Sequence, residues 1–105
     1  MAEGRSIADF QRRIEAIYFD KDSARGLAAS TLWLVEEVGE LVRALRRGSD
    51  RANLEEEFSD VFAWLASLAS ISGVELEQVA WNKYGRGCPR CASTPCTCGV
   101  GDTNN

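Results

Sequence analysis

The sequence predicts an all-α fold of four helices. Apolar residues recur at intervals of three and four through most of the first 84 residues, which is the spacing of one buried helix face. Helix-ending signals divide these stretches, notably Gly48 after a basic pair and the dipeptide Ser72-Gly73. We found no alternating strand pattern and no hairpin turn. With 105 residues, the chain is long enough for one domain with one core.

The first helix is expected over residues 6–19, with Ser6 as its N-cap and Asp9 three residues on, close to a capping box. Residues 20–23, Asp-Lys-Asp-Ser, predict a polar break after it. A second helix is then expected over residues 27–47.

Ser49 or Asp50 is expected to cap a third helix that ends near Ile71. A shorter fourth helix is expected over residues 74–84, with Trp81 as a core or interface residue.

Composition and charge exclude several classes of protein. The net charge of −4, with no dominant basic patch, argues against a binder of nucleic-acid polymers. No run is apolar enough to cross a membrane, and residues 1–5 lack the apolar core of a signal peptide. A cytoplasmic location is the expectation. The chain has no histidine, which excludes histidine-ligated metal sites.

Two acidic pairs on neighbouring helices are the strongest functional signal. Glu37 and Glu40 precede the predicted turn, and Glu57 and Asp60 follow it. The i, i+3 spacing places both members of each pair on one helix face. A helix hairpin brings the two faces together, and a helical-wheel projection places Glu57 in the middle of an apolar arc.

Close carboxylates repel one another by about 1 kcal/mol in water and about 4 kcal/mol at an intermediate dielectric. Desolvation adds to this cost. A divalent cation with oxygen ligands offsets it, and Mg²⁺ suits carboxylates combined with substrate phosphates. The alternative is a solvated acidic face whose charges pair with nearby arginines, namely Arg43, Arg46, Arg47 and Arg51.

Two tryptophans and two basic residues are candidates for substrate contacts. Trp33 and Trp64 share the carboxylate side of their helices and are suited to stacking on a base; for Trp33, core filling is an equal alternative. Lys83 and Arg86 are candidates for phosphate contacts, with a solvated helix end as the alternative.

From Gly85 onward, Gly, Cys, Pro, Ser and Thr replace the helix formers. We therefore divide the chain into a helical domain, residues 1–84, and a cysteine-rich tail, residues 85–105. The tail contains all the cysteines of the chain: Cys88, Cys91, Cys96 and Cys98. A Cys-x-x-Cys followed by a second close pair is typical of a structural zinc knuckle. Disulfides, in an oxidising compartment, and free thiols are the alternatives.

The motif Glu36-Glu37-x-x-Glu40, followed after residues 41–56 by Glu57-x-x-Asp60, resembles that of the MazG-type nucleotide pyrophosphohydrolases. These belong to the all-α NTP pyrophosphatases, with the dimeric dUTPases and phosphoribosyl-ATP pyrophosphatase. The resemblance covers residues 6–84 as a four-helix domain. Some compact members also end in Lys-Tyr and a cysteine-rich tail, like Lys83-Tyr84 here. This chain departs from them at residues 85–87, Gly-Arg-Gly, where members often carry more basic residues and a proline.

The resemblance implies that NTP and water are converted to NMP and pyrophosphate, as house-cleaning of (d)NTPs. It implies Mg²⁺, or Mn²⁺, bound by Glu37, Glu40, Glu57 and Asp60. Glu36 is then an outer-shell group or helps Glu37 to activate water, and Trp64 lines the substrate pocket. A homodimer or homotetramer is also implied. The alternatives are a dUTP- or dCTP-selective member and a non-catalytic helical interaction module with a zinc knuckle.

Overall fold

The structure is a computed structural model that describes residues 4–101. Its helices are α1 (Ile7–Arg25), α2 (Leu27–Arg47), α3 (Arg51–Ile71) and α4 (Leu76–Tyr84), and residues 4–101 contain no strand. The predicted all-α fold of four helices is therefore confirmed. Residues 1–3 of the predicted helical domain and residues 102–105 of the predicted cysteine-rich tail lie outside the described residues. Part of residues 1–5, which were considered as a signal peptide, therefore also lies outside them.

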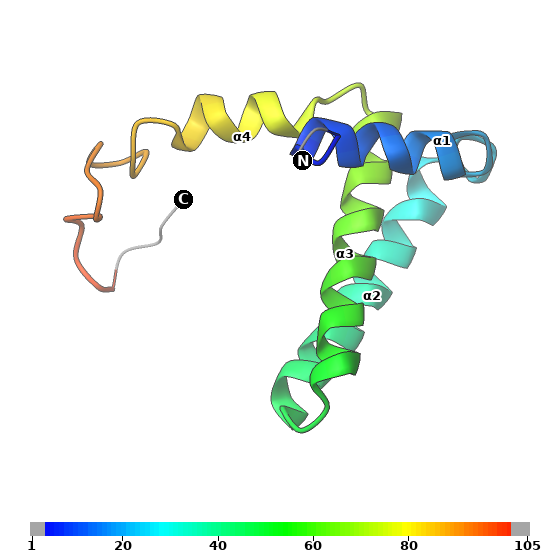
Figure 1. Cartoon of the computed structure of the whole chain (residues 1–105), viewed down its shortest axis with the longest axis horizontal. Coiled ribbons are helices and arrows are strands. Elements are labelled where there is room, and N and C mark those ends of the chain that lie inside the picture. The colour runs from blue at the N-terminus through cyan, green and yellow to red at the C-terminus, as the bar shows by residue number, and fades with distance from the viewer. Residues whose placement is uncertain (1–3, 102–105) are drawn as a thin grey trace.

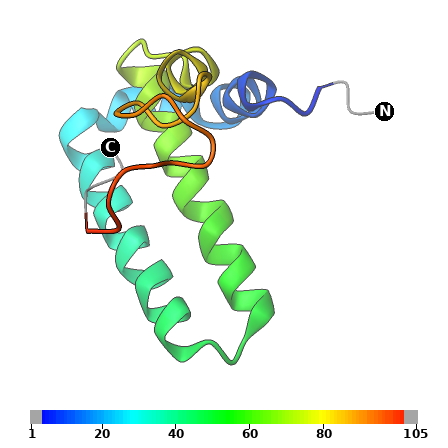
Figure 2. The same ribbon diagram turned by 90° about the vertical axis from the view of Figure 1, so that its left-hand side faces the viewer.

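The helices are arranged as a long hairpin with a crossing helix at one end. Helices α2 and α3 run antiparallel along the hairpin, and α1 crosses its open end (Figure 1). Helix α4 packs against α1 and projects sideways, and the cysteine tail continues beyond it. Figure 2 shows the same hairpin side-on, with α2 and α3 adjacent along their length. The chain therefore has a hairpin body and a protruding arm.

Helix α1 is longer than predicted, and the expected polar break at residues 20–23 is wrong. The helix continues to Arg25 because Asp22 is buried, only 3% exposed, and its Oδ1 pairs with Arg25 Nη1 at 2.8 Å. A polar segment without glycine or proline stays helical when its charges pair one turn apart. The break falls at Gly26, whose φ of 91° ends α1 and starts α2. The predicted capping box of Ser6 and Asp9 is confirmed.

The turn between α2 and α3 forms as predicted. Gly48 adopts the left-handed conformation, with φ of 63°, and its N–H donates to the carbonyl of Ala44. Asp50 caps α3, since its Oδ1 accepts from the Asn53 N–H at 3.0 Å. A connection of this length forces the two helices to run antiparallel. The two acidic motifs therefore face each other at similar heights along the hairpin.

Among the described residues, small and polar side chains make up most of the buried core, together with Ile14. Ala66 and Ser30 are fully buried and allow the helices to approach closely. The rings of Phe10 and Phe62 stack between α1 and α3 with their centroids 4.9 Å apart. The fully buried Gln11 joins α1 to the turn before α4.

Both polar atoms of the Gln11 amide have hydrogen-bond partners. Its Nε2 donates to Ser70 Oγ at 3.1 Å and to the Val74 carbonyl at 2.8 Å, and its Oε1 accepts from the Leu76 N–H at 3.0 Å. Helix α4 therefore begins at Leu76, two residues later than predicted, because this amide holds residues 74–76 before the first helical turn. The buried amide positions the whole arm.

Large apolar side chains remain on the surface of the single chain. Trp81 is 65% exposed, so its interpretation as a core residue is wrong for an isolated chain. Leu32 is 71% exposed and Val35 62% exposed on α2. No helix within residues 4–101 is both long and apolar enough to cross a membrane.

Candidate active site

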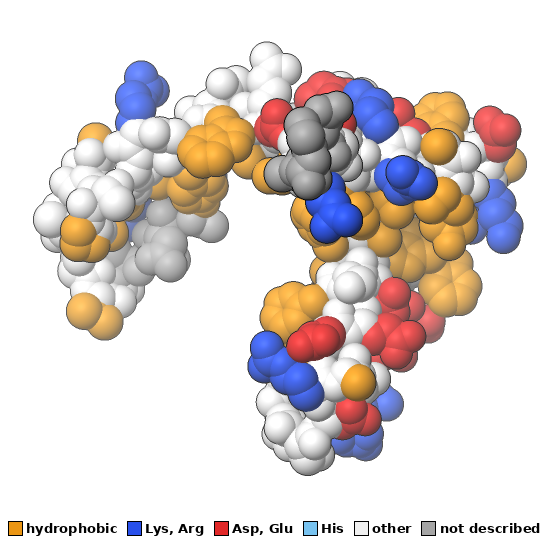
Figure 3. All heavy atoms as spheres, viewed as in Figure 1, with side chains coloured by type: hydrophobic (Ala, Val, Ile, Leu, Met, Phe, Trp, Pro, Cys, Tyr) orange, Lys and Arg blue, Asp and Glu red, His pale blue; other side chains and the backbone are white. Residues whose placement is uncertain are grey.

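Three carboxylates from the two helices of the hairpin converge on one point. Glu37 and Glu40 extend from α2 and Glu57 from α3, and one oxygen of each lies within 4.8 Å of the others. Acidic side chains form patches partway along the hairpin in Figure 3. The predicted pairing of the two motifs across the hairpin therefore holds for these three residues, which we call the acid cluster.

The acid cluster lacks compensating charge among the described residues. Arg51, one of the arginines considered as a partner, pairs instead with Glu55 at 3.0 Å. None of the ion pairs within residues 4–101 involves Glu37, Glu40 or Glu57. The arginine pairing that the sequence left open as an alternative is therefore absent from the acid cluster within residues 4–101.

Burial and like charge leave two members of the acid cluster in unfavourable surroundings. Burial first, and then the charges of the neighbouring carboxylates, raise the pKa of Glu37. Glu57 has one oxygen, Oε1, that is buried without any hydrogen-bond partner. Its other oxygen, Oε2, accepts only a long bond of 3.4 Å from Asn53 Nδ2. A buried, unpartnered carboxylate oxygen costs several kcal/mol unless a cation binds there.

This donor set fits a hard divalent cation. It consists of carboxylate oxygens alone, they converge from two rigid helices, and one of them has no protein partner. Softer metals that prefer thiolate or imidazole ligands are not matched by it.

Asp60, the fourth predicted ligand, lies beside the acid cluster. Its charge contributes to the raised pKa of Glu37, but its oxygens are not part of the group in which Glu37, Glu40 and Glu57 converge. Asp60 also lines an adjoining pocket of about 250 Å³. It therefore connects the acid cluster to the pocket.

The pocket lies between α1 and α3 and combines aromatic, acidic and basic groups. Its lining residues are Tyr18, Lys21, Asp22, Arg25, Asp60, Ala63, Trp64 and Ser67. The volume is near the lower limit for small-molecule sites, so it is suited to part of a nucleotide rather than to all of it.

Trp64 forms the centre of an aromatic and cationic stack at the pocket. Its ring is stacked on that of Trp33 with centroids 5.9 Å apart and planes 5° from parallel. The guanidinium carbon of Arg25 lies 5.1 Å from the centroid of the Trp64 ring. Trp33 remains 46% exposed, so it still offers apolar surface to a ligand.

Sequence reasoning missed the contribution of α1 to this pocket. Tyr18, Lys21, Asp22 and Arg25 all come from the last two turns of α1. Three of them fall in or just after the segment interpreted as a polar break. The available signal was the i, i+3 pair of Asp22 and Arg25, which predicts continued helix.

The other predicted site residues lie elsewhere. Glu36 is exposed on α2, and its charge contributes to the raised pKa of Glu37. Lys83 lies on α4 with its Nζ 5.6 Å from the ring centroid of Tyr84, and Arg86 is exposed just beyond the helix. Figure 1 shows α4 pointing away from the hairpin, so neither residue reaches the acid cluster of its own chain. The four cysteines gather separately in the tail.

Comparison with protein-family models identifies the family of this chain. The model of the MazG nucleotide pyrophosphohydrolase domain matches residues 25–92. The chain belongs to the MazG nucleotide pyrophosphohydrolase family. The matched part of this MazG domain contains the whole α2–α3 hairpin, helix α4 and the first cysteine pair. Comparison with curated proteins found no match.

The residues matched by the family model cover most, but not all, of the groups described above. Both acidic motifs and both hairpin tryptophans lie inside the matched residues. Most of α1 lies outside them, although it supplies much of the pocket wall.

Proposed function

We propose that this MazG domain is a Mg²⁺-dependent nucleoside triphosphate pyrophosphohydrolase that converts an NTP and water to an NMP and pyrophosphate. The observation that carries the proposal is the buried, unpartnered Oε1 of Glu57 within a cluster of three carboxylates. The physiological role that fits is house-cleaning of canonical or damaged (d)NTPs in the cytoplasm.

The acid cluster and Asp60 are the residues that hold the metal in this proposal, with Mn²⁺ as a substitute for Mg²⁺. When bound, the divalent ion neutralises phosphate charge and acidifies a coordinated water. Glu36 is solvent-exposed beside Glu37, and we assign to it the role of orienting the attacking water and accepting its proton. Glu37 supports the same water from within the cluster. An acidic protein can thus bind a polyanion, because its acids hold the metal and the metal holds the phosphates.

The nucleotide extends from the acid cluster into the adjoining pocket. Trp33 and Trp64 supply the aromatic surface on which a base stacks. Because Trp64 already contacts Trp33 and Arg25, base binding at Trp64 displaces one of these neighbours or occurs on the exposed surface of Trp33. Lys21 and Arg25 bring positive charge to the pocket wall and balance the phosphate charge nearest to Asp60.

A second copy of the chain completes the site. Helix α2 exposes Leu32, Val35 and Val42, at 71%, 62% and 48%. A row of apolar residues this exposed on a helix indicates an interface. We infer a homodimer, or a homotetramer built from it, in which α2 and α3 of two chains form a helical bundle.

The arm then acts between subunits. Lys83 and Arg86 are remote from the acid cluster of their own chain, so any phosphate contact they make is to a nucleotide held by the other chain. This arrangement reconciles the predicted role of both residues with their position in the fold.

Pyrophosphate release from a panel of NTPs and dNTPs with Mg²⁺ tests the proposal. We expect turnover by the wild-type protein and none above background by Glu57→Gln. Turnover confined to dUTP or dCTP identifies the selective alternative. Absence of turnover on every nucleotide refutes the enzyme and favours a non-catalytic helical module that binds a protein partner.

The role of the arm is tested separately with mixed oligomers. We expect oligomers made only of Lys83→Ala chains or only of Glu57→Gln chains to be inactive. Oligomers that contain both variants should regain turnover. In them, one site combines the intact acid cluster of the Lys83→Ala chain with Lys83 from the Glu57→Gln chain. No recovery in verified mixed oligomers rules out the contribution between subunits.

A further inference from the structure

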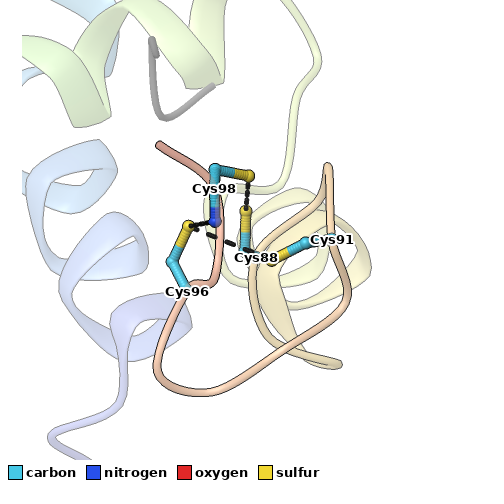
Figure 4. A group of neighbouring side chains, drawn as sticks. All are labelled: Cys88, Cys91, Cys96 and Cys98. Atoms are coloured by element: carbon cyan, nitrogen blue, oxygen red, sulfur yellow. Dashed lines mark hydrogen bonds between the residues drawn. The ribbon is translucent and has the colours of Figure 1, made fainter. Parts of the chain in front are cut away.

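The four thiols of the tail form a second group of metal-ligating side chains, separate from the acid cluster. All four Sγ atoms lie within 4.8 Å of one another. Cys88 and Cys98 are 3.9 Å apart at their sulfurs, and Cys91 and Cys96 are also 3.9 Å apart (Figure 4). We propose that these four cysteines bind one Zn²⁺ ion in a closed structural site.

The sulfur separations match a zinc tetrahedron. A Zn–S bond of about 2.3 Å requires sulfurs about 3.8 Å apart at the corners of a regular tetrahedron. Two opposite edges of this group, at 3.9 Å, agree with that length. A disulfide needs sulfurs about 2.05 Å apart and joins them in pairs. All four thiols are free here and surround one common point, which fits a single central ion better than two bridges.

The backbone of the tail is shaped around these sulfurs. The Thr97 N–H donates to Cys91 Sγ and the Cys98 N–H donates to Cys96 Sγ, both at 3.3 Å. Such N–H···S bonds stabilise thiolates, the form in which cysteine binds a metal. They act as the outer shell that orients metal ligands.

Two further backbone features close the loop that holds the first cysteine pair. The Ala92 N–H bonds to the Cys88 carbonyl at 2.6 Å, and Ala92 adopts a φ of 58°, which is unusual for a residue with a side chain. At Gly87, with φ of 104°, an added Cβ would lie 2.7 Å from Thr94 Oγ1. The tight turn therefore depends on glycine before the first cysteine and on a left-handed residue after the second.

The position of the site argues for a structural role. Four protein thiolates complete the coordination of zinc and leave no position for water or substrate. The Gly87 N–H bonds to the Tyr84 carbonyl at 3.1 Å, which links the loop directly to the end of α4. Figure 1 shows the tail on the far side of α4 from the hairpin. Zinc at this site orders the tip of the arm and takes no part in the chemistry of the acid cluster.

The test is metal analysis of the full-length protein purified without chelator. We expect about one zinc per chain in the wild type and in Glu57→Gln, and a loss of at least about 10-fold in Cys91→Ser and Cys98→Ser. Replacement by Co²⁺ should give the visible absorption of a tetrahedral thiolate site. Far-UV circular dichroism of the serine variants should show an intact helical domain, because the tail makes no part of the hairpin.

Three results overturn the inference. They are iron in place of zinc, wild-type protein with four freely titrating thiols and no bound metal, and serine variants that keep one zinc per chain. Because the readout is metal content, a negative result here leaves the proposed pyrophosphohydrolase activity intact, and an inactive enzyme leaves the zinc site intact.

Discussion

Glu57→Gln should make the metal-free protein more stable while abolishing its response to Mg²⁺. Glu57 brings a third negative charge to within 4.8 Å of Glu37 and Glu40. Two unit charges at that separation repel by about 0.9 kcal/mol in water and about 3.5 kcal/mol at an effective dielectric of about 20. Removing one charge relieves two such pairs.

The expected net gain is smaller than the sum of those pairs. All three side chains keep some contact with solvent, which screens the repulsion. The new amide, in addition, donates hydrogen bonds to the remaining carboxylates. We therefore expect a gain of about 1–2 kcal/mol, or roughly 5–10 °C in Tm for a chain of this size.

The assay is thermal unfolding followed by circular dichroism, with EDTA and with Mg²⁺, at fixed protein concentration. Wild type should gain stability when Mg²⁺ is added, and Glu57→Gln should not. Glu56→Gln is the matched control, since Glu56 is exposed one position earlier on the same helix and the substitution changes net charge equally. A metal-free Glu57→Gln that melts at or below wild type, or an equal Mg²⁺ response in both, refutes the metal site.

Three further predictions follow from the same contacts. Glu40→Gln and Asp60→Asn should each lower turnover at least about 100-fold without changing helix content; wild-type turnover by either would remove that residue from the ligand set. The pKa of Glu37 is raised in the folded state, so the metal-free protein should gain stability as the pH falls toward the ordinary value of 4.5. Because Mg²⁺ must displace that proton, its apparent affinity should fall over the same window in calorimetric titrations between about pH 8 and about pH 5, and a pH-independent affinity would contradict this. Gln11→Ala should lower the free energy of unfolding in urea by about 2–4 kcal/mol, because it leaves backbone groups before α4 unpaired and opens a cavity. Substitution of the exposed Gln78 by alanine is the control. Equal losses of stability in both variants would show that the buried amide does not hold α4.

The sequence by itself determined the α2–α3 hairpin and the three carboxylates of the acid cluster, although Asp60, predicted with them, lies beside the cluster. Helical periodicity, a glycine after Arg47 and an aspartate before Arg51 specify an antiparallel hairpin locally, without reference to the rest of the chain. The i, i+3 spacing of acids then specifies which carboxylates share a face. The gathering of the four cysteines in one short tail could also be predicted, because thiols only a few residues apart lie close together through local spacing alone.

Only the tertiary structure decided which groups surround the acids. The sequence predicts Asp22 in a polar break, whereas in the structure it is buried against Arg25. The same pairing extends α1 and brings basic residues to the pocket wall. The sequence predicts a phosphate contact for Lys83, but only the structure shows that α4 points away from its own hairpin. Contacts between residues distant in sequence depend on how helices pack, and the sequence pattern of each helix fixes its own faces but not the direction in which the next helix leaves.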